Sequence, residues 1–258
     1  MKNLLKEKML KGEKPIGMFH ELSSASAVEC IKYGGMDYVV IDTEHGPGDV
    51  ESTLEYIRAA KGQELTPLVR VKDGSRNSIL KMLDIGAMGL IIPNVRSLEE
   101  AEKIVSYGKY YPVGERGVAP TAGSSYWFAD YAQQGMSHYF EVSNAESLIL
   151  PQCETRGCLE QIEEIAALEG IDGIFVGPYD LSVALGIPGE FDKQELIDAL
   201  NRVVKACKDN NKFSIIYAGN IDAARKNYEQ GFDSVTYGMD AIALVESVKS
   251  IITKIFEN

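Results

Sequence analysis

Two carboxylates follow consecutive apolar segments of the chain, and their type and position suit binding of a divalent cation. Glu154 follows the segment Leu148–Gln152, and Asp180 follows Gly173–Val176. If the two segments are neighbouring strands, about 4.8 Å apart, both carboxylates can bind one hard cation and leave positions for water and a chelating substrate. An exposed pair of side chains at the rim of a sheet, or a helix cap at each position, would explain the same pattern without a metal.

His45 and Arg70 are the other residues whose surroundings indicate chemistry. His45 lies in a short glycine-containing segment with Asp42 and Glu44, and histidine transfers protons near neutral pH. The alternative is a hydrogen bond from His45 to its own loop. Arg70 lies inside the otherwise apolar segment Pro67–Val71. Because a buried arginine needs a partner, it forms either a structural ion pair or a contact with a substrate carboxylate or enolate oxygen.

The other histidines and the cysteines carry weaker signals. We expect His20 to pack in the core or at the rim, and we assign no role to His138. Cys153 and Cys158 flank Glu154, but no second cysteine or histidine pair accompanies them. The four cysteines of the chain are therefore expected to be free thiols rather than zinc ligands or disulfides.

Composition excludes several classes of protein. The 258 residues carry a net charge of −12, which disfavours binding to nucleic acid, and 45% of them are hydrophobic, which excludes intrinsic disorder. No apolar run approaches the roughly 18 residues of a membrane span, so no membrane association is expected. The segment 1–14 alternates charged and apolar residues and does not resemble a secretory signal. We expect a cytoplasmic enzyme.

Short apolar segments alternate with longer segments of helical periodicity, which is typical of βαβ units and a parallel sheet. The expected strands are Pro15–His20, Asp37–Ile41, Pro67–Val71, Gly89–Pro93, Leu148–Gln152, Gly173–Val176, Phe213–Tyr217 and Phe232–Tyr237. The expected helices are Ala25–Tyr33, Val50–Lys61, Ser75–Ile85, Leu98–Tyr107, Cys158–Leu168, Lys193–Asn210, Asp222–Glu229 and Asp240–Phe256, and Leu4–Leu10 is expected to close the bottom of the fold.

Eight strand–helix units in this length predict an α/β protein, a single (β/α)₈ TIM barrel over residues 1–258. The segment Gly108–Glu146 is expected to be a long loop insertion between strands four and five. In such a barrel the active site lies at the carboxyl ends of the strands, where His45, Glu154 and Asp180 are placed and toward which Arg70 lies. The last helix has a broad apolar face, which either packs on its own barrel or contacts a second copy of the chain.

Several long motifs resemble one enzyme family. The segments IDTEHGPGDV, PLVRV, MLDIGAMGLIIPNV, GERGV, LPQCETRGCLEQIEEI and GIDGIFVGPYDLSVALG are similar to those of the HpcH/HpaI class II pyruvate aldolases. This family includes 2,4-dihydroxyhept-2-ene-1,7-dioate aldolases and 2-keto-3-deoxy-sugar-acid aldolases. The similarity extends from about Ile16 to Gly238 and implies a barrel of the phosphoenolpyruvate/pyruvate type.

The resemblance implies a role for each candidate residue. Glu154 and Asp180 would hold Mg²⁺, Mn²⁺ or Co²⁺, which pyruvate chelates, and Arg70 would stabilise the enolate. His45 would transfer protons, paired with Asp84 and near Asp42. The substrate-binding residues would be Gln152, Gly177, Pro178, Tyr179 and Arg70. The resemblance also implies a homo-oligomer, specifically a hexamer.

The implied activity is reversible cleavage of a 2-keto-4-hydroxy acid to pyruvate and an aldehyde, an aldehyde-lyase reaction. One alternative is a citrate-synthase-like or other enzyme that forms a carbon–carbon bond from a 2-oxo acid such as oxaloacetate. The other alternative is a non-catalytic barrel that binds a metabolite. The chain departs from the family at Tyr179, where alanine is usual, and at Ala122–Ser124, where a basic residue is frequent. Both positions border the expected aldehyde side, so the aldehyde is not identified.

Overall fold

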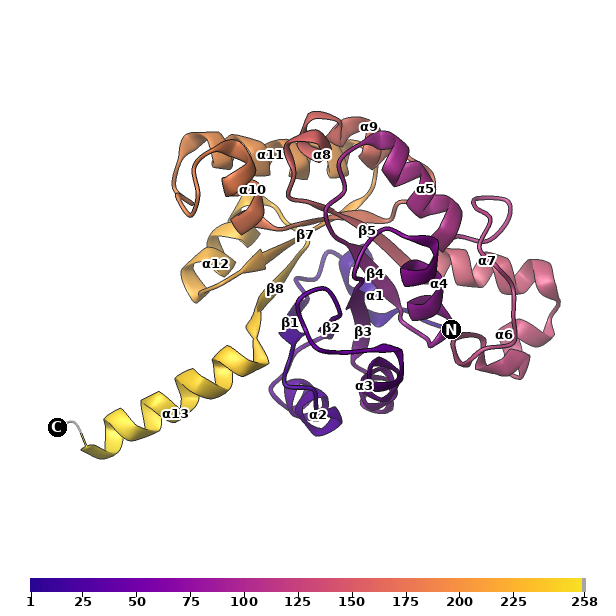
Figure 1. The fold of residues 1–258 in the computed structure, drawn as a ribbon, viewed down its shortest axis with the longest axis horizontal. Coiled ribbons are helices and arrows are strands. Elements are labelled where there is room, and N and C mark those ends of the chain that lie inside the picture. The colour runs from indigo at the N-terminus through magenta and orange to yellow at the C-terminus, as the bar shows by residue number, and fades with distance from the viewer. Residues whose placement is uncertain (257–258) are drawn as a thin grey trace.

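Eight parallel strands form a closed barrel in the computed structural model, which describes residues 1–256 (Figure 1). The last two residues of the expected domain, 257–258, lie outside the described residues. The strands pair in sequence order, and the last pairs with the first. They are β1 Ile16–His20, β2 Tyr38–Asp42, β3 Thr66–Arg70, β4 Gly89–Ile92, β5 Leu148–Cys153, β6 Gly173–Val176, β7 Phe213–Ala218 and β8 Ser234–Met239. The predicted TIM barrel is confirmed.

The strands are apolar because both of their faces are covered. One cluster of side chains, including Phe19, Leu68 and Phe175, fills the barrel interior, and a larger cluster packs the outer face against the helices. Helix α1 (Leu4–Leu10) contributes Leu5 to the inner cluster, and its backbone N–H at Leu5 donates to Thr66 Oγ1 at the start of β3. The opening helix therefore closes the amino end of the barrel, as predicted.

The helices between strands follow the predicted segments with small shifts at their ends. They are α2 Ala25–Tyr33, α3 Val50–Gly62, α4 Arg76–Asp84, α5 Leu98–Gly108, α8 Arg156–Glu160, α9 Ile162–Ala167, α10 Pro178–Leu185, α11 Gln194–Asp209, α12 Ile221–Gln230 and α13 Asp240–Phe256. The prediction of one helix over Cys158–Leu168 was wrong, because the backbone leaves helical geometry at Gln161 and separates α8 from α9. Helix α10 was not predicted.

The segment between α5 and β5 contains three short helical elements, so the expected long loop insertion is not confirmed. It contains the 3₁₀ helix η1 (Ala122–Trp127), α6 (Asp130–Gln133) and α7 (Met136–Glu146), and residues 109–121 form its irregular part. Lys109 fastens the segment to the barrel, because its buried Nζ donates to Asn144 O at 2.8 Å, Ser147 O at 2.6 Å and Asp172 Oδ2 at 2.7 Å.

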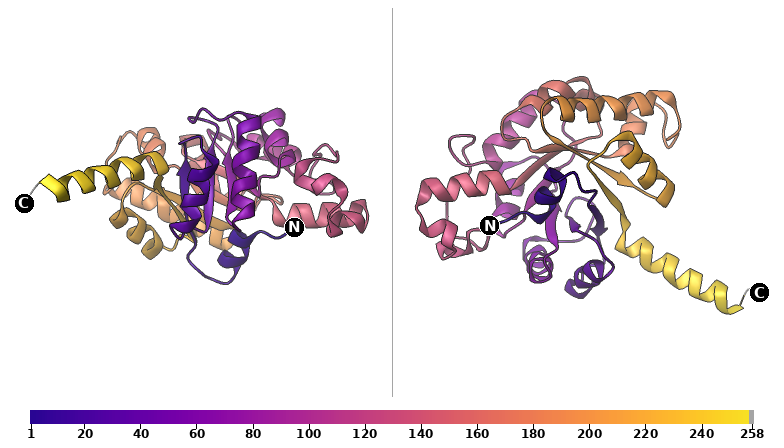
Figure 2. Two further views of the ribbon diagram at one scale, coloured as in Figure 1. Left: turned by 90° about the horizontal axis from the view of Figure 1, so that it is seen from below. Right: turned by 180° about the vertical axis from the view of Figure 1, so that it is seen from behind.

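Helix α13 projects away from the barrel instead of covering it. In all three views of Figures 1 and 2 it extends on the side of the molecule opposite α6 and α7. Its apolar side chains are 47–76% exposed, namely Ile242, Leu244, Val245, Val248, Ile251, Ile252, Ile255 and Phe256. The interpretation that this helix packs on its own barrel is therefore wrong. Within residues 1–256, no helix combines the length and apolar character needed to cross a bilayer.

Candidate active site

A cavity of about 450 Å³ at the carboxyl ends of the strands brings together three of the predicted site residues. Glu154 comes from the end of β5, Asp180 from α10 after β6, and His45 from the segment after β2. The residues that line this cavity include Glu44, His45, Asn94, Arg96, Glu154, Thr155, Arg156, Gly157 and Asp180. The strand ends place polar groups from four different βα units around one space, as the barrel fold predicts.

Glu154 is buried and held by two hydrogen bonds. Its Oε1 accepts from the Asn94 backbone N–H at 2.7 Å, and its Oε2 accepts from Nε2 of Gln152, two residues earlier on the same face of β5. Burial raises the pKa of Glu154, and the negative charge of Asp180 raises it further. The carbonyl Oε1 of Gln152 is buried and has no hydrogen-bond partner in the described part of the chain. The charges of the two carboxylates therefore interact, and the Arg70 guanidinium offsets part of this effect at Glu154.

Asp180 lies in the first turn of α10, which begins at Pro178 directly after Gly177. A Cβ atom at Gly177 would lie 2.8 Å from Glu154 Oε2, so the absence of a side chain lets this helix begin beside the carboxylate. Asp180 is exposed to the cavity mouth, and Tyr179 is 51% exposed and packs on Tyr217. The predicted Gly177, Pro178 and Tyr179 therefore lie together at the rim.

The donor set fits a hard divalent cation with an incomplete protein shell. Glu154 and Asp180 supply oxygen donors, which such cations prefer, and the unpartnered Gln152 Oε1 lies beside them. No group of three or more histidine, cysteine or acidic ligands occurs among residues 1–256. A cation held here would retain open coordination positions.

Arg70 is paired with Asp42, which is the structural ion pair that the sequence offered as one of two interpretations of this arginine. Its Nε donates to Asp42 Oδ1 at 2.9 Å and its Nη2 to Oδ2 at 2.5 Å, and Nε also lies 3.4 Å from Glu44 Oε2. Burial alone would raise the pKa of Asp42, but the Arg70 guanidinium outweighs it and holds this pKa below its ordinary value. The remaining nitrogen, Nη1, makes no hydrogen bond within the described chain, so the pairing does not exclude contact with a substrate.

His45 and Asp84 do not pair within one chain. The His45 side chain is 69% exposed, and its Nε2 lies 3.9 Å from Glu44 Oε2. Asp84 ends α4, which runs back from the rim, and its carboxylate lies 2.9 Å from Arg116 Nη2. The prediction that His45 and Asp84 pair is therefore wrong within one chain. A helix that follows a barrel strand ends at the amino end of the barrel, so Asp84 lies there, whereas His45 lies at the carboxyl rim.

The structure reveals rim residues that sequence reasoning did not assign. Glu44, Arg96 and Arg156 line the cavity, and each follows a predicted strand within a few residues. His20 is buried, as expected, but its Nδ1 lies 2.6 Å from Oδ2 of Asp240 at the first turn of α13. Position directly after a strand was the available signal for Glu44, whereas nothing in the local sequence indicated the His20–Asp240 pair.

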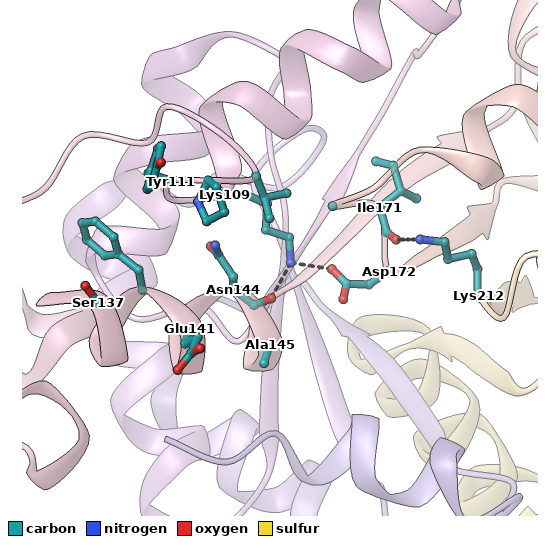
Figure 3. Close-up of a pocket in the computed structure, with 13 residues that line it drawn as sticks. Lys109, Tyr111, Ser137, Glu141, Asn144, Ala145, Ile171, Asp172 and Lys212 are labelled. Atoms are coloured by element: carbon teal, nitrogen blue, oxygen red, sulfur yellow. Dashed lines mark hydrogen bonds and ion pairs between the residues drawn. The ribbon is translucent and has the colours of Figure 1, made fainter. Parts of the chain in front are cut away.

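A larger cavity of about 520 Å³ lies away from these residues (Figure 3). Lys109, Tyr111, Asn144, Asp172 and Lys212 are among its lining residues. Both lysines are already bound, Lys109 to Asp172 and to backbone carbonyls, and Lys212 Nζ to Ile171 O at 2.7 Å. Both cationic groups of this cavity are therefore already engaged, and none of the predicted site residues lines it.

Comparison with known proteins decides the family. The sequence profile of the HpcH/HpaI aldolase/citrate lyase family matches residues 15–247. The chain belongs to this family. It is 37% identical to a hydroxypyruvate/pyruvate aldolase of Sagittula stellata, over 77% of this chain and 76% of the relative. It is 32% identical to the 2-keto-3-deoxy-L-rhamnonate aldolase of Escherichia coli (strain K12), over 94% and 89% of the two chains.

A solved HpcH/HpaI aldolase from Desulfitobacterium hafniense DCB-2 has the same fold as this family member. The TM-score is 0.90 at 27% identity, and the match covers 99% of this chain and 98% of the other. The resemblance found in the motifs is thus confirmed, as is the expectation of an enzyme of the aldolase (lyase) type. Both named sequence relatives are aldolases, which favours that activity over the two alternatives raised by the sequence.

Proposed function

We propose that this protein is a metal-dependent aldolase that reversibly cleaves a 2-keto-4-hydroxy acid to pyruvate and an aldehyde. The observation that carries the proposal is the shared cavity of Glu154, Asp180 and His45, beside Arg70, in a chain of an aldolase family. We expect residues 1–258 to form one domain. The enzyme is expected to act in the cytoplasm on a small-molecule 2-oxo acid. We expect neither nucleic acid nor membrane as a partner.

Glu154 and Asp180 are proposed to hold the divalent cation, Mg²⁺, Mn²⁺ or Co²⁺. When bound, such a cation polarises a ketone and makes the neighbouring C–H more acidic. The chain's contribution is to fix the direction of the Glu154 carboxylate through Asn94 and Gln152. The incomplete ligand set agrees with a substrate that completes the coordination.

Pyruvate is proposed to be oriented by Arg70, Gln152 and the backbone of Gly177–Asp180. Asp42 holds the Arg70 guanidinium by two hydrogen bonds, so its free Nη1 can hold positive charge near the substrate oxygen that becomes negative. The first N–H groups of α10 point out of the helix start and suit a carboxylate. Tyr179 stands at the same rim and narrows the space for the aldehyde.

His45 is proposed to move the proton, and its predicted partner Asp84 must then come from a second copy of the chain. Within one chain Asp84 lies at the amino end of the barrel beside Arg116, whereas His45 lies at the rim and is exposed. This arrangement agrees with the expected homo-oligomer, a hexamer by resemblance, and α13 supplies an apolar face for such contacts.

Release of pyruvate from a panel of 2-keto-4-hydroxy acids tests the proposal. Chelator-treated protein should be inactive and should regain activity with Mn²⁺. Glu154→Gln and Asp180→Asn should lose both Mn²⁺ binding, followed by electron paramagnetic resonance, and pyruvate release. The surface variant Glu55→Gln, whose side chain pairs with Arg58 on α3, is the control and should behave as wild type. Metal-independent pyruvate release, or normal Mn²⁺ binding in both site variants, would refute the assignment.

The role of His45 has its own test. His45→Ala should lower kcat for cleavage by about 10²- to 10⁴-fold while Mn²⁺ binding persists. Exchange of the pyruvate methyl protons with solvent deuterium, followed by NMR, should slow in parallel, because both reactions need the same proton transfer. Unchanged exchange in a folded, Mn²⁺-loaded variant would remove His45 from proton abstraction.

A further inference from the structure

Two arginines whose guanidinium groups have no acidic partner among residues 1–256 line the candidate active site. The chain has eight arginines, and within residues 1–256 the guanidinium groups of five of them lie within 4.0 Å of a carboxylate oxygen: Arg58, Arg70, Arg116, Arg202 and Arg225. Of the remaining three, Arg96 and Arg156 both line the cavity that contains Glu154 and Asp180. Both residues are exposed, and within residues 1–256 neither guanidinium group has a carboxylate partner, although carboxylates outnumber cationic side chains in this protein of net charge −12.

The backbones that carry these arginines are locked together. Arg96 lies in the segment between β4 and α5, and Arg156 begins α8 after β5. The Thr155 hydroxyl donates to Val95 O at 2.5 Å, which joins the two segments. A Cβ atom at Gly157 would lie 2.2 Å from Arg96 O, so the two backbones are in direct contact at this glycine. The arginines therefore project from one rigid base.

Further hydrogen bonds hold the Arg96 backbone and the Arg156 guanidinium, and they connect the two segments to Glu154, the proposed metal ligand. The Arg96 backbone N–H donates to Glu100 Oε2 at 2.8 Å. Arg156 Nη2 donates to Ala184 O at 2.9 Å, on the helix that carries Asp180. Asn94, two residues before Arg96, donates its N–H to Glu154 Oε1 at 2.7 Å. The remaining donors of both guanidinium groups have no protein acceptor in the described chain and are available to a ligand.

From this geometry we propose that Arg96 and Arg156 form an anion subsite, which binds a carboxylate or phosphate at the far end of the substrate's aldehyde half. Planar guanidinium groups bind such anions through paired, charge-assisted hydrogen bonds. A substrate whose pyruvate half is bound at Glu154 and Asp180 extends through the same cavity to the two arginines. The subsite selects aldehydes that carry a terminal anion over neutral ones. This inference rests on the proposed aldolase function.

The test compares matched aldehydes in the condensation direction. Pyruvate and Mn²⁺ are combined with 4-oxobutanoate or its neutral methyl ester, and with glycolaldehyde phosphate or glycolaldehyde, so that the two anion types are assayed separately. Wild type should show a kcat/KM about 10- to 100-fold higher for an anionic aldehyde than for its neutral analogue. The double variant Arg96→Gln/Arg156→Gln should lose that preference through a higher KM and leave the neutral aldehydes within about twofold.

Two controls separate failure of this inference from failure of the proposed function. Arg76→Gln removes the third arginine without a carboxylate partner, which lines a different cavity, and should keep the preference. Exchange of pyruvate methyl protons needs no aldehyde, so it should proceed normally in the double variant. Equal kcat/KM of wild type for anionic and neutral aldehydes, or an equal loss for both in the double variant, would overturn the subsite. Absence of exchange in wild type would instead overturn the aldolase assignment.

Discussion

At the scale of single residues, Arg70 shows how an ion pair prepares a cationic group for chemistry. Its Nε and Nη2 both bind Asp42, which fixes the guanidinium plane. Arg70→Lys keeps the charge but cannot make both bonds and also present a free nitrogen. We expect turnover to fall by about 10²- to 10³-fold with the fold retained, measured by pyruvate release and circular dichroism. Near-normal kcat in this variant would leave Arg70 a purely structural residue.

Because Asp42 titrates, the contribution of the Arg70–Asp42 ion pair to the stability of the fold depends on pH. Its pKa in the folded protein is below the ordinary value, so the pair stabilises the fold above the pKa of the unfolded state, and this contribution is lost as pH falls through the lower folded pKa. Asp42→Asn removes the charge that pairs with buried Arg70 and leaves Glu44 Oε2, 3.4 Å from Arg70 Nε, as its acidic neighbour, so it should cost about 3–5 kcal/mol at pH 7. Urea unfolding of both proteins should show this difference shrinking below about pH 4. A difference that stays constant with pH would contradict the argument.

At the scale of elements, the buried Lys109 anchors the segment between α5 and β5, residues 109–147, to the barrel. Its side chain is 2% exposed and bonds α7 and the following turn to Asp172, before β6. Burial lowers the pKa of Lys109, and the neighbouring Asp172 carboxylate offsets part of this effect. Lys109→Met removes these bonds and leaves Asp172 with Lys6 at 3.2 Å as its remaining lysine partner.

We expect Lys109→Met to lower the free energy of unfolding by about 3–5 kcal/mol. Limited proteolysis should cut the variant faster within residues 109–147, because the anchor of that segment is lost. Lys103→Met, on the surface of α5 where Lys103 pairs with Glu99, is the matched control and should change stability little. Equal stability of the two variants, measured by urea unfolding, would show that Lys109 is not an anchor.

At the scale of the whole molecule, the exposed apolar residues of α13 bear on the oligomeric state of the protein. The helix carries exposed apolar residues along one face and polar residues such as Ser250 on the other. A surface of this kind is typical of an interface between subunits. It agrees with the proposed homo-oligomer and with the need for Asp84 from a second copy.

We expect wild type to have a mass several times 28.3 kDa by light scattering. Val248→Glu/Ile252→Glu places charges in the centre of the apolar face and should shift the mass toward that of one chain. Cleavage activity should fall together with the mass, because the proposed His45–Asp84 pair needs two copies. Ser250→Glu, on the polar face, should leave both mass and activity unchanged. A single-chain mass for wild type would exclude the oligomer.

Much of the fold could be predicted because its signals are local. Segments such as Gly89–Ile92 and Gly173–Val176 are apolar throughout, since a barrel strand is covered on both faces. The polar residues that directly follow these strands had to meet at one rim, because parallel strands end on the same side. For that reason Glu154, Asp180 and His45 could be predicted to lie at one rim, and the structure places all three at one cavity. Helix α10 was not predicted, because it is short and begins at Pro178 inside the motif GIDGIFVGPYDLSVALG.

Contacts between distant segments were decided by the tertiary structure alone. The sequence by itself determined the barrel, the family and the rim residues, since each depends on hydrophobic periodicity or on a motif. It could not determine that Arg70 pairs with Asp42, that Asp84 lies beside Arg116, or that α13 leaves the barrel. Those outcomes depend on where segments far apart in the chain meet and on which partner best compensates each buried charge, and no local pattern encodes either.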